Sequence, residues 1–362
     1  MYNLTYFYNS IKPDTFAPRN SKLIRAEILF KTIKMEYRKL GNTDLELSVI
    51  THGAFAIGGN MWGGNDKKDS INSIHASLDH GVTSIDTAPF YGFGLSEEMI
   101  GEAIKGKDRS KIQLLTKFGL VWDGSTKGKG EFFFDAEDNG KKLPVFKYTS
   151  KTNIIKEVEE SLKRLDTDYI DLLQLHWPDN STPISETMEA FELLIQQGKI
   201  RTAGVSNYSV DQMEEATKTF KLASNQVSYS MLNRTIENDL VPYALETETG
   251  IIVYSPMERG LLTGKYFKET KLKDNDHRNG YFTQFDLDKV KTFLDAIEPI
   301  AHSKNATLSQ LVLRWTTLQP AVTVVLAGAR NAEQAIQNAA TMDIDLNSQE
   351  LNFIHQELLK AS

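Results

Sequence analysis

Residues 169–205, YIDLLQLHWPDNSTPISETMEAFELLIQQGKIRTAGV, contain the repeating unit from which the fold can be predicted. An apolar run at Tyr169–Leu175 is followed by a helical pattern at Ser185–Gln197, and a second apolar run, IRTAGV, comes directly after it. Ser185 is expected to cap the start of this helix, and Gly198 suits the left-handed residue that ends it. A strand, a helix and a strand in succession predict two neighbouring parallel strands.

Short apolar runs recur along the chain as candidate strands, and helical patterns separate most of them. They are Ser48–Gly53, Val82–Asp86, Ile112–Lys117, Tyr169–Leu175, Ile200–Val205, Asn225–Tyr229, Ile251–Tyr254 and Ala321–Ala327. Eight such units in one domain favour a closed (β/α)8 barrel, the TIM barrel, over an open doubly wound α/β sheet. The open sheet would also require a G-x-G-x-x-G turn after its first strand, and neither Gly58-Gly59 nor Gly63-Gly64 forms one.

Further segments add detail to this plan. Tyr37–Leu47 has the pattern of an N-terminal β-hairpin that could close the lower end of the barrel. Gly250 follows a helical pattern, where a left-handed helix end is expected. Residues 121–148 form a long loop after the third strand, and such a loop should overhang the active site and shape a substrate pocket. The triple aromatic run Phe132–Phe134 is interpreted as an anchor of that loop.

The composition narrows the class of protein. The net charge is −7 with a pI of about 5.6, which argues against nucleic acid or an anionic membrane as the main partner. The chain has no Cys and no long apolar stretch, which fits a cytoplasmic protein. Residues 1–34 carry six Lys or Arg and two Asp or Glu, unlike the acidic remainder. We interpret residues 1–34 as a disordered or non-native extension, and residues 35–362 as the barrel.

Polar and ionisable residues end the predicted strands, at the mouth where barrel enzymes place their active sites. They are Asp86, Lys117, His176, Ser206-Asn207, Gln226 and Tyr254-Ser255. A carboxylate and an ammonium in one crowded mouth should pair, because either alone faces a large desolvation cost. The charge of Lys117 would lie beside Tyr91, favour the anionic phenol and make it a better proton donor. With a neutral His176 to orient a substrate oxygen, the site suits proton delivery to a carbonyl, but it offers no electron source.

Six motifs occur in the order and spacing of a known family. They are IDTAPFYGFGLSEEMIGEAI at 85–104, LLTKFG at 114–119, YIDLLQLHWPD at 169–179, GKIRTAGVSNY at 198–208, YSPMERGLLTGKY at 254–266 and LAGARNAEQAIQNA at 326–339. From about Tyr37 to the C-terminus the chain therefore resembles the aldo-keto reductases. Within that family it is most similar to the bacterial general-stress and sugar-aldehyde reductases, through FAIGGNMWGG at 55–64.

The resemblance implies NADPH-dependent reduction of an aldehyde or ketone, with Asp86, Tyr91, Lys117 and His176 as catalytic residues and Tyr91 as the general acid. The nicotinamide would supply the hydride. Arg330 could pair bidentately with a 2′-phosphate, which favours NADPH over NADH. The residues that the resemblance assigns to cofactor binding are Gly53, Ser206, Asn207, Gln226, Tyr254, Ser255, Pro256, Gly260, Leu261, Gly264, Lys265, Gly328, Ala329, Arg330, Gln334 and Asn338.

The expected substrate contacts are aromatic: Phe55, Trp62, Phe90 and Trp177. Such a mouth could accept aromatic aldehydes as readily as sugars or sugar-derived carbonyls, so the substrate stays open. The chain also departs from the family pattern at Met257-Glu258, and an acidic side chain near a pyrophosphate would be unfavourable unless it points away.

Two other functions are compatible with a barrel. A metal-dependent hydrolase would need clustered His, Asp and Glu ligands, whereas only His52 stands at the end of the first strand, so no metal site is predicted. A cofactor-binding sensor or accessory protein with weak activity could share the fold, because fold does not determine function. The sequence predicts neither the oligomeric state nor the physiological direction of the reaction.

Overall fold

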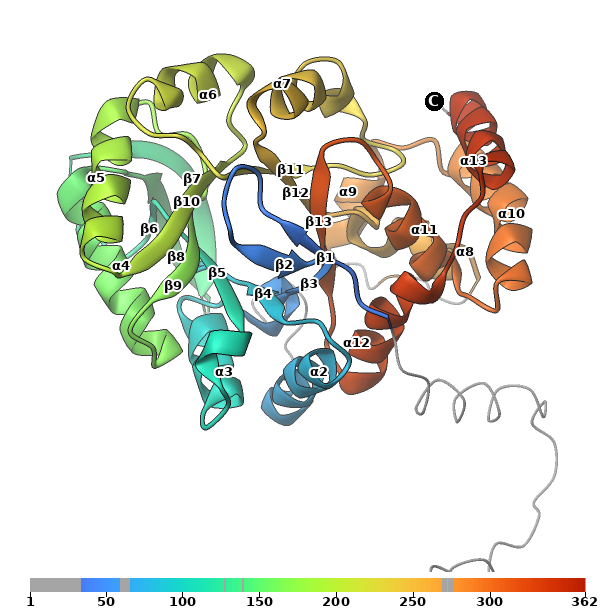
Figure 1. Ribbon diagram of the computed structural model, residues 1–362, viewed down its shortest axis with the longest axis horizontal. Coiled ribbons are helices and arrows are strands. Elements are labelled where there is room, and N and C mark those ends of the chain that lie inside the picture. Colours follow the sequence, from blue (N-terminus) through green and yellow to red (C-terminus); the bar gives the residue numbers. More distant parts are fainter. Residues whose placement is uncertain are drawn as a thin grey trace, which may run out of the picture. The chain divides into compact units, whose positions relative to one another are not determined.

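The computed structural model describes residues 34–58, 66–126, 128–138, 140–268, 272 and 277–361. Their central feature is a closed barrel of eight strands, which confirms the predicted fold (Figure 1). Its strands pair in parallel in the order β10-β11-β12-β13-β3-β4-β5-β9, and β9 returns to β10. They are β3 (Ile50–Gly53), β4 (Ser84–Asp86), β5 (Gln113–Phe118), β9 (Ile170–Leu175), β10 (Ile200–Ser206), β11 (Ser224–Ser228), β12 (Gly250–Tyr254) and β13 (Val322–Gly328). The predicted N-terminal extension lies outside the described residues, except for Lys34.

Helices alternate with these strands and surround the barrel (Figure 1). The α-helices are α2 (Lys67–Asp79), α3 (Leu95–Ile104), α4 (Lys151–Leu165), α5 (Ile184–Gln196), α6 (Val210–Thr217), α7 (Leu240–Thr247), α8 (Lys265–Lys268), α9 (His277–Phe282), α10 (Leu287–Ser303), α11 (Leu308–Thr317), α12 (Ala332–Ala339) and α13 (Ser348–Ala361). Short 3-10 turns are η1 (Ala54–Gly58), η2 (Arg109–Lys111), η3 (Thr235–Glu237), η4 (Glu258–Thr263) and η5 (Ala340–Asp343). Within the described part of the chain, none of these helices has the length and apolar character needed to cross a membrane.

Two predicted helix ends are wrong and one is confirmed. Helix α5 begins before Ser185, directly after Pro183, whose restricted φ already suits a helix start without a side-chain cap. Gly198 is left-handed beyond the end of α5, as predicted. Gly250 is not left-handed, because Glu248 takes that conformation and Gly250 already belongs to β12. A Cβ at Gly250 would lie 2.8 Å from the side chain of Leu40, so close packing is what favours glycine there.

The predicted N-terminal hairpin is confirmed, and it closes one end of the barrel. Strands β1 (Tyr37–Lys39) and β2 (Glu46–Ser48) pair antiparallel and lie across the ring of strands in Figure 1. Leu40 and Leu47 are fully buried against inward-facing side chains that include Leu172 of β9. The hairpin therefore closes the barrel interior from below with buried leucine side chains.

The long segment after β5 is an ordered antiparallel sheet. It consists of β6 (Leu120–Val121), β7 (Glu131–Asp138) and β8 (Lys141–Lys147), in the order β6-β8-β7. The register of β7 on β8 shifts between Phe132 and Phe134, which marks a β-bulge. Because β6 follows β5 after a single residue, Gly119, this sheet is joined closely to the barrel mouth.

Two buried glutamate side chains hold the upper end of β5 from the helix side. Glu97 of α3 accepts a 2.6 Å hydrogen bond from Thr116 of β5 and pairs with Arg164 of α4 at 2.7 Å. Glu157 of α4 accepts the backbone N–H of Gly119 at 3.0 Å. Burial raises the pKa of Glu157 to about 8. These contacts hold the chain just before Lys117, at Thr116, and two residues after it, at Gly119.

Replacing Glu157 with Gln should flatten the pH dependence of stability. The folded protein holds the Glu157 proton more tightly than the unfolded chain does. The stabilisation of the folded state by this proton is therefore complete below a pH near 4.5 and is lost as the pH rises through about 8. The free energy of unfolding of Glu157→Gln minus that of wild type should therefore increase by about 1–3 kcal/mol from about pH 6 to about pH 9. Urea unfolding at both pH values measures this gain. Glu160→Gln, on the exposed side of α4, is the control, and an equal gain there would contradict the assignment.

Candidate active site

A cleft of about 770 Å³ opens at the carboxyl ends of the barrel strands, a size typical of ligand sites. Most of the predicted site residues line it: Gly53, Phe55, Asp86, Phe90, Tyr91, His176, Trp177, Ser206, Asn207, Gln226, Tyr254, Ser255, Pro256, Gly260, Lys265, Gly328, Arg330, Gln334 and Asn338. Leu261, Gly264 and Ala329 are not among its lining residues, and Leu261 and Ala329 are buried. Trp62 lies outside the described residues. Lys117 is buried next to Asp86 and Tyr91 in the cleft wall.

The buried ion pair expected between Lys117 and Asp86 is present. Lys117 Nζ lies 2.6 Å from Asp86 Oδ1, and the two side chains are 1% and 2% exposed. The ammonium also donates to the carbonyl of Thr87 at 2.9 Å and to Tyr91 Oη at 3.2 Å. Burial would lower the pKa of Lys117, but Asp86 and Tyr91 together raise it above its ordinary value. The side chain is therefore a cation at neutral pH beside the phenol.

Asp86 has a second set of partners inside the barrel. Its Oδ2 accepts hydrogen bonds from Gln226 Nε2 at 2.8 Å and Gln174 Nε2 at 3.2 Å. Gln174 was not predicted as a site residue, although the alternation of side chains along β9 indicates that it faces the barrel interior. Leu172 of β9 faces the barrel interior, so Gln174, two residues further along, faces the mouth. Both oxygens of the buried carboxylate therefore accept hydrogen bonds, and these bonds fix its orientation.

The predicted effect of Lys117 on Tyr91 is present, but it is not the dominant one. Burial raises the pKa of Tyr91, Asp86 adds to this, and the ammonium of Lys117 lowers it by less. The expectation of a net lowered pKa is therefore wrong, because desolvation penalises a phenolate more than one neighbouring cation stabilises it. The phenol stays protonated through neutral pH, and Lys117 is positioned to stabilise negative charge on its oxygen.

His176 lies beside Tyr91, with a ring-centroid separation of 5.8 Å. Burial lowers the pKa of His176 well below its usual range, and the charge of Lys117 lowers it further. The imidazole is therefore neutral at physiological pH, as predicted. Its backbone is held on both sides, since its N–H donates to the carbonyl of Phe118 and its carbonyl accepts from Asn207 Nδ2.

A polar shelf extends from the proton-donating groups along the ends of β10, β11 and β12. Tyr254 Oη donates to Asn207 Oδ1 at 2.9 Å, and Ser206 Oγ donates to the carbonyl of Gln226 at 2.8 Å. Burial raises the pKa of Tyr254 to about 12. The ring of Tyr254 thus borders the cleft while its hydroxyl is held, which leaves an aromatic face of the kind on which a planar ring can stack.

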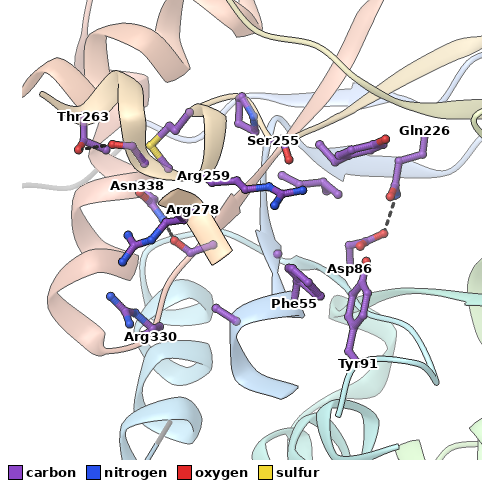
Figure 2. A pocket seen from close by; sticks show the side chains of 18 of the residues that line it. Phe55, Asp86, Tyr91, Gln226, Ser255, Arg259, Thr263, Arg278, Arg330 and Asn338 are labelled. Carbon is purple, nitrogen blue, oxygen red and sulfur yellow. Dashed lines mark hydrogen bonds between the residues drawn. The ribbon is translucent and has the colours of Figure 1, made fainter. Parts of the chain in front are cut away.

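The opposite end of the cleft is cationic. Figure 2 shows Arg330 and Arg278 far from Asp86 and Tyr91, with Arg259 between the two ends. Arg259 and Arg278 were not predicted as site residues. Arg259 lies within the motif at 254–266, and Arg278 lies in none of the six motifs. Lys265 lines the same cleft. Several cations at one end and an aromatic face nearer the other fit a dinucleotide, whose phosphates and planar ring have the complementary properties.

Glu258 points away from this cationic end, which removes the concern raised by its charge. It is fully buried and accepts hydrogen bonds from the hydroxyls of Ser230 and Tyr281. The guanidinium of Arg259 lies 3.8 Å from the centre of the Tyr281 ring. The carboxylate therefore ties η4 to α9 and does not line the cleft.

His52 also has a packing role. It is buried, its Nδ1 is 2.8 Å from Ser77 Oγ of α2, and burial lowers its pKa to about 4. In the part of the chain that the structure describes, no three His, Asp or Glu side chains are grouped so that they could hold a metal ion. The ligand set that a metal-dependent hydrolase needs is therefore missing from the described residues.

A double-mutant cycle tests the buried ion pair. Asp86→Asn keeps the shape but leaves the ammonium of Lys117 without its counter-charge, so it should cost about 3–5 kcal/mol of unfolding free energy. Lys117→Met should also destabilise, and the double variant should be at least about 2 kcal/mol more stable than the sum of the two losses predicts. Urea unfolding of the four proteins measures the coupling. Additive losses would show that the two charges do not stabilise each other.

Comparisons with known proteins agree with this geometry. The sequence model of the Aldo/keto reductase family matches residues 49–357. The chain is 39% identical to an aldo-keto reductase of Bacillus subtilis, over 87% of this chain and 91% of that protein. It is 34% identical to an NADH-specific methylglyoxal reductase of Escherichia coli, over 88% of this chain and 96% of the other.

Solved structures give the same result. A glycerol dehydrogenase of Gluconobacter oxydans superposes with a TM-score of 0.79 at 35% identity, over 90% of this chain and 95% of the other. An aldo-keto reductase of Klebsiella pneumoniae in complex with NADPH superposes with a TM-score of 0.65 at 28% identity, over 89% and 95%. The chain therefore belongs to the aldo/keto reductase family, whose members are NAD(P)H-dependent oxidoreductases that act on carbonyl groups.

Proposed function

We propose that this enzyme reduces an aldehyde or ketone with NADPH, and that Tyr91 donates the proton to the carbonyl oxygen. The observation that carries the proposal is the position of Lys117 Nζ, which is within hydrogen-bond distance of both Asp86 and Tyr91 in a buried mouth. A carbonyl oxygen that gains negative charge needs a donor that is protonated at neutral pH. Tyr91 meets that requirement because burial raises its pKa.

The surrounding residues have distinct tasks in this proposal. Lys117 stabilises the phenolate as Tyr91 loses its proton, and Asp86 keeps the ammonium in place. His176 is neutral, so its ring can donate one hydrogen bond that orients the carbonyl oxygen without competing for the proton. When it is bound, the nicotinamide supplies the hydride. Tyr254, Ser206 and Asn207 would hold the nicotinamide end of the cofactor.

The phosphates and the adenosine would lie toward the cationic end. Lys265 and Arg259 line the part of the cleft expected to receive the pyrophosphate, and Arg330 the part expected to receive the adenosine 2′-phosphate. The side chain of Gln334 accepts the backbone N–H of Arg330 at 2.9 Å, and Asn338 Nδ2 donates to the carbonyl of Gly328 at 3.0 Å. These bonds hold the backbone at Gly328 and Arg330, from which the guanidinium would reach the 2′-phosphate.

Tyr91→Phe should lower kcat by about 10²–10⁴-fold, because it removes the proton donor and keeps the ring. The oxidation of NADPH, followed by absorbance with a panel of aldehydes, measures the loss. NADPH affinity, followed by fluorescence, should stay within about twofold of wild type if the variant keeps its site. Tyr169→Phe, at the other end of the barrel, is the control. Equally slow turnover by wild type and Tyr91→Phe would contradict the proposal and favour a cofactor-binding accessory protein.

The preference for NADPH is tested at Arg330. A guanidinium that pairs with the 2′-phosphate contributes nothing to NADH, which lacks that group. Arg330→Gln should therefore weaken NADPH binding by about tenfold or more and change NADH binding by less than about twofold. Fluorescence titration of both cofactors measures this. The preference would be wrong if wild type bound NADH more tightly, as the name of the Escherichia coli relative suggests for that protein.

A further inference from the structure

The bulge in β7 changes which aromatic side chains reach the cleft. On β8, Phe132 pairs with Phe146 and Phe134 pairs with Val145, so Phe133 has no partner residue in the ladder. In a regular strand, successive side chains point to opposite faces. Here Phe133 and Phe134 are adjacent, both are half-buried and both line the cleft, whereas Phe132 is 55% exposed. The extra residue thus brings two neighbouring rings into the site.

Each of these rings packs on a different loop of the barrel mouth. The ring of Phe134 lies 5.7 Å from that of Phe90, which follows β4. The ring of Phe133 lies 5.4 Å from that of Trp177, which follows β9 next to His176. The sheet therefore joins the loop of the proton donor to the loop of the neutral histidine. Phe133 and Phe134 therefore line the cleft in addition to holding the loop in place.

Polar contacts on the outside hold the sheet in this position. Lys147 Nζ lies 5.3 Å from the centre of the Phe133 ring and 2.7 Å from Glu131. Glu131 in turn accepts from the backbone N–H and the side-chain amide of Asn180, in the loop that follows β9. The wall made by Phe133 and Phe134 is therefore tied to the barrel at its base.

Among the described residues, aromatic side chains border the part of the cleft next to Tyr91 and His176. The ring of Phe55 lies 4.8 Å from that of Tyr91, and Trp177 directly follows His176 in the chain. The rings of Phe133, Phe134 and Phe90 continue this aromatic lining from Trp177 through successive ring contacts. Of these lining side chains, only the indole N–H of Trp177 can form a conventional hydrogen bond. Of the arginines that line the cleft, Arg330 and Arg278 lie remote from Tyr91 in Figure 2, and Arg259 lies between the two ends.

We propose that the bulge-supported pair Phe133 and Phe134 makes this enzyme select aldehydes with an aryl or unbranched alkyl group over polyhydroxylated aldehydes such as sugars. The inference rests on the proposed carbonyl reduction. A hydroxyl that enters this wall loses its water and finds only the indole N–H of Trp177 among these side chains as a partner, whereas an apolar group gains from burial. This narrows the substrate class, which the sequence left open between aromatic aldehydes and sugars. It also departs from the small polar compounds, methylglyoxal and glycerol, that appear in the names of two relatives.

The first experiment compares 3-phenylpropanal with glyceraldehyde, each corrected for its fraction of free carbonyl. The kcat/KM for 3-phenylpropanal should exceed that for glyceraldehyde by about 100-fold. Propanal, which has the carbon chain of glyceraldehyde without its hydroxyls, should also exceed it, by about tenfold. Equal values, or a preference for glyceraldehyde, would overturn the inference.

The second experiment changes the wall itself. Phe133→Ser and Phe134→Ser should each reduce the ratio of kcat/KM for 3-phenylpropanal over glyceraldehyde by about tenfold or more. Phe132→Ser removes the neighbouring ring from the exposed side of the same strand and should leave the ratio unchanged. Phe133→Leu should restore most of the ratio, because the wall stays apolar. A ratio makes the test independent of losses of folded enzyme, which lower both values equally.

The outcomes separate this inference from the proposed function. If the NADPH-bound protein reduces neither aldehyde, the proposed function fails and the inference fails with it. If it reduces both, but Phe133→Ser and Phe134→Ser leave the ratio as it is in wild type, only the inference fails. A shift of the ratio by Phe132→Ser as large as that by Phe133→Ser would likewise overturn it, since an effect of the strand as a whole would then be responsible.

Discussion

The burial of one ammonium group is the constraint on which the rest of the site depends. An unpaired charge inside the barrel mouth would be strongly destabilising, so Lys117 of β5 must have partners that the fold provides. Asp86 ends β4, and the amides that hold its other oxygen come from β9 and β11. Because these partners lie on separate strands, the charge is satisfied only when the barrel closes in this register. The same closure brings Tyr91 to the ammonium.

The cleft above this pair has two chemically different ends. Arg278 and Arg330 lie at one end and Arg259 lies between the ends, whereas aromatic side chains border Tyr91 and His176. A dinucleotide with a charged phosphate end can enter in only one productive direction. In the proposed reaction, aromatic side chains would exclude water from the place of proton transfer, and this would strengthen the electrostatic effect of Lys117 on the phenol. In the proposed reaction, the cofactor phosphates would therefore use the cationic part of the cleft, and proton transfer would use its apolar part.

The parts of this structure that depend on local pattern could be predicted from the sequence. Apolar runs located the barrel strands, and their last residues located Asp86, Lys117 and His176. Features that depend on tertiary packing and strand pairing could not be predicted from the sequence. The net pKa shift of Tyr91 follows from desolvation that only packing reveals, and the bulge at Phe133 depends on its pairing with β8. Arg278 reaches the cleft from α9, which no motif marked, and Gly250 is required by the close approach of the hairpin.

The central claim is that the buried cation of Lys117 stands beside a phenol that remains a neutral proton donor. The most direct test is the single-turnover rate of aldehyde reduction by the NADPH-bound enzyme as a function of pH. NADPH deuterated at the transferred hydrogen identifies the hydride step by its isotope effect. Because Tyr91 stays protonated and His176 stays neutral, the rate should be constant between about pH 6 and about pH 9. A rate that falls about tenfold per pH unit from neutrality upward would show that the donor ionises there, and would contradict the account.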